Sequence, residues 1–468
     1  MDATVATKGP KERPGATGSI LAANVAMLAG LSFGLLYGTG SPLIVAGATA
    51  LVMAVVIAFV AAYRFPIVFL AFLVIRPMLD GFKFSSRGGS SLAEPSVAVS
   101  VVLLTAGALW LLAQHSSGSW KHVSNATKAI CVLAVVMTIS VITSTFISAS
   151  TQFALRVATA AVAALVAEQL VRTNPERRRH ILLAVTVSAI GPLLSATLQM
   201  VSGGGNDDKG VTRIRGPFVH PNPFGTYLFI VGFGGLALMW LYPRYKYLAI
   251  AVMSGCCVIS LFTYTRVTWI AFVVGAVVLG VLQSRRLIWL VVVGVLVVAV
   301  AVPSATARLS DLGDKKVAGA GDPNSLEWRI SYWGQILPWT ADNPITGIGM
   351  GGVAQRASIG LPPHNIWVEL LVEGGAVGLT TGVVGAWVLG GDLRKRRRIA
   401  RAAGNRPLQA ATAAVIAVAI GLLVQSFSEN LLEEAITLVY FFVIVAAVIP
   451  EPVTAPSQAP ASALPSPV

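Results

Sequence analysis

Apolar runs of about 18 to 24 residues, separated by polar stretches, follow one another along most of the chain. Because about 20 apolar residues span a bilayer core as a helix, each run is a candidate transmembrane helix. Hydropathy predicts about fourteen of them. They start near residues 19, 42, 65, 94, 127, 152, 179, 222, 246, 267, 286, 365, 408 and 434. Two are atypical: the run from 65 is short and contains Arg76 and Asp80, and the run from 152 contains Arg156 and Glu168.

Composition agrees with this pattern. Of the 468 residues 55% are hydrophobic and 12% charged, whereas soluble domains have about 25% charged residues. We therefore predict an all-α, polytopic membrane protein with about 12 to 14 transmembrane helices. Residues 1–18 are expected to be a disordered cytoplasmic N-terminus, 19–451 the membrane domain, and 452–468 a disordered tail rich in Pro and Ala.

The basic residues exceed the acidic ones, 34 Lys and Arg against 20 Asp and Glu, for a net charge of +14. In a soluble protein this would suggest nucleic acid, but in a membrane protein Lys and Arg in cytoplasmic loops first set the topology. With a cytoplasmic N-terminus, alternating spans place roughly 21 of the 34 basic residues inside and about 11 outside. The inner cluster 394–398 is interpreted as a topology determinant, with contact to anionic lipid as the alternative.

The outer basic residues slightly oppose that rule and need another explanation. Several lie where the sequence turns polar beside a membrane helix, namely Arg213, Arg215, Arg266 and Arg329. Arginine is always charged and its fork of donors matches phosphate oxygens. The set therefore predicts a site for a lipid-linked phosphate or diphosphate, while snorkelling or helix-end anchoring is the alternative for any single member.

Two outer segments are long, residues 202–221 and 303–363, and connections longer than about 15 residues are usually functional or disordered. Aromatic residues favour a folded, partly helical loop for the second segment, which contains Trp328, Tyr332, Trp333 and Trp339. Asn324, three residues before Glu327, is a helix-start signal. Such a helix would place Arg329 and Trp333 on one face. Gly347 and Gly349 further along this segment would permit close backbone approach to a ligand.

His364 lies where the long segment meets the next membrane helix, after two prolines that suit a helix start. The helix dipole disfavours imidazolium there, so His364 should be neutral near pH 7, the form that a general base needs. A structural histidine is the alternative. Asn365 could orient the ring, bind a sugar hydroxyl or cap the helix. His220 is the rival base, although His220 and Asn222 also suit a helix start that positions Arg215.

Acidic residues inside membrane helices are functional candidates by default. Arg76 and Asp80, spaced i and i+4, could simply pair with each other. Glu369 and Glu373 follow His364 on the same predicted helix, and we hypothesise that Glu369 pairs with Arg266 or Arg329. The outer loops contain no Asp-X-Asp motif or His/Asp cluster, so the sequence favours a reaction with no metal and no cofactor.

Four motifs in order resemble the O-antigen ligase / O-antigen polymerase superfamily of bacterial membrane proteins. They are RGPFVHPNPFGTYL from Arg215, TRVTW around Arg266, RISYW from Arg329 followed by NPITGIG, and HNIWVELLVEGGAVGL from His364. Together they cover about residues 210–380. The resemblance implies a GT-C-like glycosyltransferase that is inverting, metal-independent and active on the outer face of the bacterial plasma membrane.

The implied donor is a glycan on undecaprenyl or related polyprenyl diphosphate. His364 would deprotonate the acceptor hydroxyl, and Arg215, Arg266 and Arg329 would hold the diphosphate and stabilise its charge as it leaves. Arg213, Asn222, Gly347, Gly349, Asn365 and Glu369 are the expected substrate-binding residues. The acceptor, a glycan, glycolipid or protein hydroxyl, stays open. The alternative function is a lipid-linked glycan flippase or transporter, which would distribute its basic residues through a central cavity.

Overall fold

The computed structural model describes residues 64–82, 95–208, 211–301 and 325–450. The predicted tails, 1–18 and 452–468, and the first two predicted spans lie outside these residues. The chain divides into two compact units, residues 1–68 and 69–468, and the contacts discussed below lie within the second unit.

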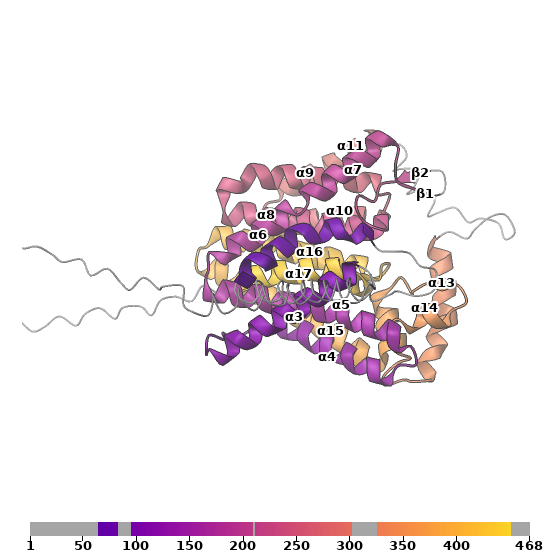
Figure 1. Cartoon of the computed structure of the whole chain (residues 1–468). Coiled ribbons are helices and arrows are strands. Elements are labelled where there is room, and N and C mark those ends of the chain that lie inside the picture. Colours follow the sequence, from indigo (N-terminus) through magenta and orange to yellow (C-terminus); the bar gives the residue numbers. More distant parts are fainter. Residues whose placement is uncertain (1–63, 83–94, 209–210, 302–324, 451–468) are drawn as a thin grey trace, which may run out of the picture. The chain divides into compact units, whose positions relative to one another are not determined.

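Helices make up nearly all of this second unit (Figure 1). The α-helices are α3 (Pro95–Ser116), α4 (Asn125–Thr143), α5 (Ile147–Thr173), α6 (Arg177–Val187), α7 (Ile190–Ser202), α8 (Pro221–Leu241), α9 (Lys246–Phe262), α10 (Arg266–Leu282), α11 (Arg286–Ala301), α13 (Ser325–Ile336), α14 (Gly352–Arg356), α15 (Ile366–Ala402), α16 (Arg406–Gln425) and α17 (Ala435–Val448). The 3-10 helices are η1 (Arg76–Phe82), η2 (Pro243–Tyr245), η3 (Leu337–Ala341) and η4 (Leu431–Glu433). Among the described residues the only strands, β1 (Asn206–Asp208) and β2 (Val211–Arg213), form an antiparallel hairpin.

The all-α membrane fold is confirmed. Each of the twelve spans predicted from residue 65 onward coincides with a helix that starts within about five residues of the predicted position. Eight helical segments of the described chain are long and apolar enough to cross a membrane, and α10, α11 and α17 are shorter apolar helices. The run from 65 is short, as predicted, because its helix changes at Arg76 into the 3-10 helix η1.

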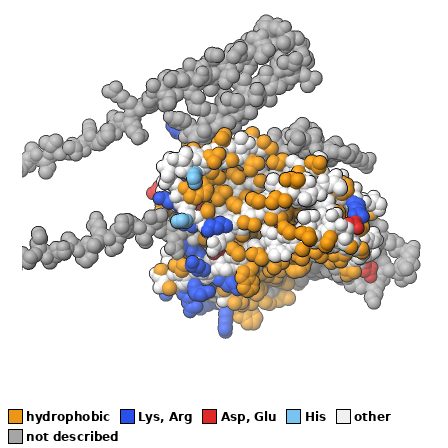
Figure 2. All heavy atoms as spheres, turned by 90° about the horizontal axis from the view of Figure 1, so that it is seen from below, with side chains coloured by type: hydrophobic (Ala, Val, Ile, Leu, Met, Phe, Trp, Pro, Cys, Tyr) orange, Lys and Arg blue, Asp and Glu red, His pale blue; other side chains and the backbone are white. Residues whose placement is uncertain are grey.

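Helices α5, α8 and α16 are mostly buried, whereas α3, α4, α9 and α15 expose most of their apolar surface. Apolar side chains cover much of the face in Figure 2, and basic side chains gather toward one end of it. Such an apolar exterior suits contact with lipid, since a soluble protein rarely exposes large contiguous apolar patches.

The segments that connect the helices contact one another at each end of the bundle, and these contacts identify the two ends. At one end, here called the basic end, the guanidinium of Arg178 donates from Nε to Ala447 O (2.8 Å) and from Nη2 to Pro450 O (2.6 Å). Arg396 donates to the same Pro450 carbonyl (2.9 Å). At the other end, here called the site end, the connections that contain residues 144–146, 211–220, 263–265, 337–365 and 426–434 meet. This grouping agrees with the alternation of spans predicted from the sequence.

Three of the four charges that made two predicted spans atypical have partners within the described residues. Arg76 and Asp80 lie 3.7 Å apart and are both buried, as their spacing suggested. Glu168 lies at the basic end of α5, where its carboxylate accepts hydrogen bonds from Ser124 N (2.7 Å) and Arg172 Nη2 (2.6 Å). Glu168 therefore joins the start of α4 to the end of α5.

Candidate active site

His364 occupies a strained position in front of α15. Its φ is +53°, and His364 and Tyr264 are the non-glycine residues of the described chain with positive φ. This left-handed conformation costs about 1 to 2 kcal/mol for a residue with a Cβ. Such strain persists only where surrounding contacts enforce it, and it clusters at functional sites. Tyr264 precedes Thr265 and Arg266, so both strained residues adjoin predicted site residues.

Helix α13 holds the segment before His364, and a side-chain cap begins α15 directly after it. Tyr332 OH donates to Leu361 O (2.5 Å) and Trp333 Nε1 donates to Pro363 O (2.7 Å). After His364, the Asn365 side chain caps α15 by accepting from the backbone N–H groups of Trp367 (2.9 Å) and Val368 (3.2 Å). The prediction of a helix start after Pro363 is correct, and the Asn365 oxygen serves the capping alternative.

Arg329 lies beside His364 and affects its charge. Burial lowers the pKa of His364 to about 4, and the positive charges of Arg329 and His220 add to that effect. The imidazole is therefore neutral at pH 7, as predicted, although burial rather than the helix dipole is the first cause. Arg329 Nε is itself buried and donates no hydrogen bond within the described residues. A buried guanidinium N–H without an acceptor is suited to an anionic ligand.

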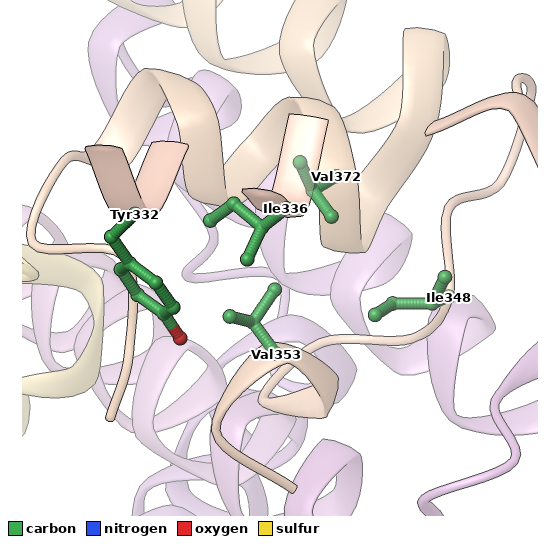
Figure 3. Packing of buried hydrophobic residues seen from close by; sticks show 5 residues of the cluster. All are labelled: Tyr332, Ile336, Ile348, Val353 and Val372. Atoms are coloured by element: carbon green, nitrogen blue, oxygen red, sulfur yellow. The ribbon is translucent and has the colours of Figure 1, made fainter. Parts of the chain in front are cut away.

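Aromatic packing fixes the helix that carries Arg329. The ring of Trp328 stacks on Tyr332 (5.3 Å between centroids) and lies 6.0 Å from the His364 ring. A small core beneath them combines residues of α13, the following loop, α14 and α15 (Figure 3). Its buried members are Tyr332, Ile336, Ile348, Val353 and Val372. The long predicted loop is therefore folded, at least over residues 325–364, and it is anchored on α15.

The glycine-rich stretch before α14 approaches α15 rather than an open site, which corrects the ligand-approach interpretation of Gly347 and Gly349. A Cβ at Gly347 would lie 2.2 Å from Glu373 O, and one at Gly349 would lie 2.0 Å from Ser144 Oγ. The φ values of the two glycines, +69° and +100°, also require glycine. The helix of α15 is interrupted at Gly375, where the amide of Ala376 donates to Pro344 O (2.9 Å). These glycines let two backbones meet.

Glu373 reinforces the same junction. Its buried carboxylate accepts from Gly351 N (2.6 Å) and Val353 N (2.8 Å), the first amides of α14. A carboxylate at a helix N-terminus is favourable because the free amides and the helix dipole both attract it. This explains one of the two intramembrane glutamates as an anchor of the outer loop.

Glu429 organises a polar network on the α8 side of the site. Asn222 Nδ2 donates to both Glu429 oxygens (2.9 and 3.2 Å), and Arg213 Nη2 donates to Asn222 Oδ1 (2.6 Å). Burial raises the pKa of Glu429 to about 7, and the positive charge of Arg329 is the largest influence that opposes this rise. Arg213 also donates to Thr263 O (2.9 Å). Arg213 and Asn222 are thus bonded within the protein, next to the Glu429 carboxyl on which the charge of Arg329 acts.

Arg215 and Arg266 lie on the neighbouring elements. Arg215 follows β2, is half-buried, and donates from Nη1 to Val219 O (3.1 Å). Arg266 is the first residue of α10, after the N-cap Thr265. Thr265 Oγ1 bonds Asn222 Oδ1 (3.2 Å), which ties the starts of α8 and α10 together. Exposed His220 is the N-cap residue of α8 and is close enough to His364 to act on its charge.

An apolar cavity of about 170 Å³ lies between α4, α15, α16 and α17. Ile366 and Trp367 line it, two and three residues after His364, and so do Leu431 and Leu432 of η4. Gly382 and Gly385 leave room for it along α15. The polar site and this apolar cavity are therefore built from adjoining residues.

Comparison with known families agrees with this arrangement. The family model described as O-antigen ligase matches residues 248–383. Over these residues the chain is similar to that family. The predicted resemblance to the O-antigen ligase / O-antigen polymerase superfamily is confirmed, and it indicates ligase- or polymerase-type function in the assembly of surface glycans. None of the curated proteins matches the chain.

The O-antigen ligase match contains Arg266, Arg329 and His364 but not Arg215 or Glu429, which the fold adds from outside it. Glu429 and Asn430 were not among the site residues predicted from the sequence, because the prediction rested on the outer arginines. The signal was present in the acidic, polar stretch SFSENLLEE between two apolar helices, residues 426–434.

Glu369 has different neighbours from those hypothesised. Its carboxylate is fully buried and accepts no hydrogen bond from Arg266 or Arg329. The charged groups that act on it are Glu433, Glu373 and, with the opposite sign, Arg156 of α5. The hypothesised pairing with Arg266 or Arg329 is therefore wrong, because Glu369 lies about one helical turn below His364, where the charges that act on it come from η4, α5 and α15 itself.

Proposed function

We propose that this protein is a membrane glycosyltransferase that moves a glycan from a polyprenyl diphosphate to an acceptor hydroxyl. One observation carries the proposal: neutral, strained His364 lies beside Arg329, whose buried Nε has no hydrogen-bond acceptor in the described chain. A neutral imidazole can accept a proton, and an arginine fork can bind a diphosphate. The match to the O-antigen ligase family supports the same reaction class.

In the proposed reaction His364 takes the proton of the acceptor hydroxyl as the acceptor oxygen forms a bond to the anomeric carbon. The bond between that carbon and the diphosphate oxygen breaks, and the electron pair leaves with the diphosphate. Attack from the opposite face inverts the anomeric centre. Arg329, Arg215 and Arg266 would stabilise the negative charge that builds on the leaving group, so that the step needs no metal.

Donor binding would also strengthen the base. The pKa of His364, about 4 in the free protein, is low for a base that works near neutrality, and the charge of Arg329 is one reason. A diphosphate bound at Arg329 would offset that charge and favour imidazolium. The base would then gain strength when donor is present.

The apolar cavity would hold the first units of the polyprenyl chain. It starts at Ile366 and Trp367, directly below His364, and its lining is almost entirely apolar. At about 170 Å³ it is smaller than a whole polyprenyl chain, so the rest would lie in the surrounding lipid. We place the site end on the extracytoplasmic face of the plasma membrane, because the excess of basic residues lies at the other end.

Complementation in cells tests the proposal. In a strain that lacks the gene, the wild-type chain should restore the surface glycan, whereas His364→Ala should insert normally, fail to restore the glycan and let the lipid-linked donor accumulate. Accumulation should be on the outer leaflet if the protein is a transferase. Accumulation on the inner leaflet would instead support a flippase, and restored glycan would remove His364 from the mechanism.

A further inference from the structure

Asn430 faces the catalytic candidate from a different part of the chain. It follows Glu429 in the connection between α16 and α17, and its side chain is buried, at 8% exposed. Asn430 Nδ2 lies 3.4 Å from His364 Nδ1. Asn430 Oδ1 is buried and has no hydrogen-bond partner in the described residues. A buried amide next to a ring nitrogen determines which proton arrangement that ring can adopt.

Backbone and side-chain bonds hold the connection that carries Asn430 against the start of α15. Ile366 N donates to Ser426 O (2.9 Å), and Trp367 Nε1 donates to Ser426 Oγ (3.0 Å). Asn365 Nδ2 donates to Phe427 O (3.3 Å). These bonds fix the start of the connection beside His364, and Glu433 N donates to Asn430 O (3.0 Å) at its other end.

The two orientations of that amide have different chemical consequences. A neutral imidazole has a single N–H. If the amide N–H donates to Nδ1, the ring proton is on Nε2, and Nε2 cannot accept another. A half turn of the amide places Oδ1 against Nδ1–H, and the lone pair of Nε2 is then free. Only the second arrangement leaves the ring nitrogen opposite Asn430 able to act as a base.

We propose that Asn430 is the positioning residue of His364: its Oδ1 accepts from Nδ1–H and fixes the tautomer in which Nε2 receives the acceptor proton. This rests on the proposed function. The other charged or titratable groups around the ring are Arg329 of α13 and His220 before α8, with Glu429 bonded to the Asn222 side of the site. The charges of Arg329 and His220 lower the pKa of His364, and an oxygen that accepts from Nδ1–H opposes that effect.

Nitrogen NMR of the full-length protein in lipid bilayers tests this without relying on activity. With ¹⁵N-labelled histidine, the His364 signal is assigned by its loss in His364→Gln. The wild type should show the Nδ1–H tautomer, and Asn430→Leu should lose that preference. A wild-type Nε2–H tautomer would overturn the proposal. If His364→Gln kept full transfer activity, the proposed function would fail while the tautomer result stood on its own.

Kinetics give a second, independent readout. Asn430→Leu should lower kcat about 100-fold with little change in KM, because a poorly oriented base still permits binding. Asn430→Asp should keep most of the activity and move the acid limb of the pH profile to higher pH, since a carboxylate favours imidazolium. Equal losses in both variants, with both proteins folded, would contradict the assignment. Asn405, which caps α16 at the basic end, supplies the control substitutions Asn405→Leu and Asn405→Asp.

Discussion

Arg178 at the basic end and Arg329 at the site end are the same residue type in different surroundings. Arg178 donates from Nε and Nη2 to two carbonyl groups at the end of α17. Arg329 Nε has no acceptor in the described chain, and its charge acts on His364 and Glu429. A guanidinium that completes a helix end is structural, whereas one held by aromatic packing with an unused donor is available to a ligand.

The outer arginines, which were predicted from the sequence as one set, also differ in whether their donors are bonded within the protein. The guanidinium of Arg213 donates hydrogen bonds to Asn222, Thr263 and Thr265 within the protein. Membership of the site end is therefore not enough to assign an arginine to the ligand.

Replacing Arg329 should have the largest effect on the reaction. Arg329→Gln is expected to lower kcat/KM by about 100- to 1000-fold, as for loss of a donor that stabilises transition-state charge. Arg329→Lys should recover part of this, because it keeps the charge and loses the fork. Glycan transfer by the purified protein in liposomes is the measurement. A loss no greater than that of the matched basic-end variant Arg178→Gln would contradict the distinction between the two ends.

Filling the apolar cavity should weaken donor binding. The space at Gly385 faces α4, with Ala129 Cβ 3.9 Å from where a Cβ would lie. We expect Gly385→Leu to raise KM about tenfold for a long-chain donor, and less for a donor with a short prenyl chain, since the lost contact is apolar. Gly391→Leu, on the same helix where nothing lies within 4 Å, is the control. The same change in KM for both donors would argue against a chain-binding role.

Replacing Arg178 should affect stability rather than chemistry. Arg178→Gln removes two hydrogen bonds to helix-end carbonyls, and each is worth about 1 to 3 kcal/mol when its partner is left buried. We expect a lower melting temperature in detergent and unchanged kcat per folded molecule. A large fall in kcat with unchanged melting would assign this arginine to the reaction instead.

The pH profile offers the smallest and most specific effect. His364 must be unprotonated to act as a base, so kcat/KM of the free enzyme should fall as pH decreases through about 4. Removing the charge of Arg329 removes a cause that lowers this pKa, and the acid limb of the residual activity of Arg329→Gln should therefore move to higher pH. If the acid limb of Arg329→Gln stays at the same pH or moves to lower pH, it does not report the protonation of His364.

Much of the fold could be predicted from the sequence because each membrane helix is a long run of apolar residues. All twelve described spans were predicted. The start of α15 and the neutrality of His364 were also predictable, since prolines and a polar-to-apolar boundary are local signals. Asn430 and Glu429 lie about 65 residues from His364 along the chain. Only the packing of α16 against α15 brings them to it.

The glycines show what could not be predicted from the sequence. Gly347 and Gly349 have the spacing of a ligand-binding loop, and the sequence gives no means to tell a ligand from the interrupted backbone of α15. Likewise Glu369 was paired by charge with arginines, yet its neighbours include two further glutamates. Local patterns report conformational freedom and charge, whereas the identity of the partner depends on tertiary structure.

The most direct test of the central claim is single-turnover transfer by purified protein in liposomes, with a lipid-linked donor already bound. For His364→Gln we predict a rate at least about 100-fold below wild type, with donor affinity and melting temperature unchanged. Transfer at the wild-type rate by this variant would contradict the account of the site.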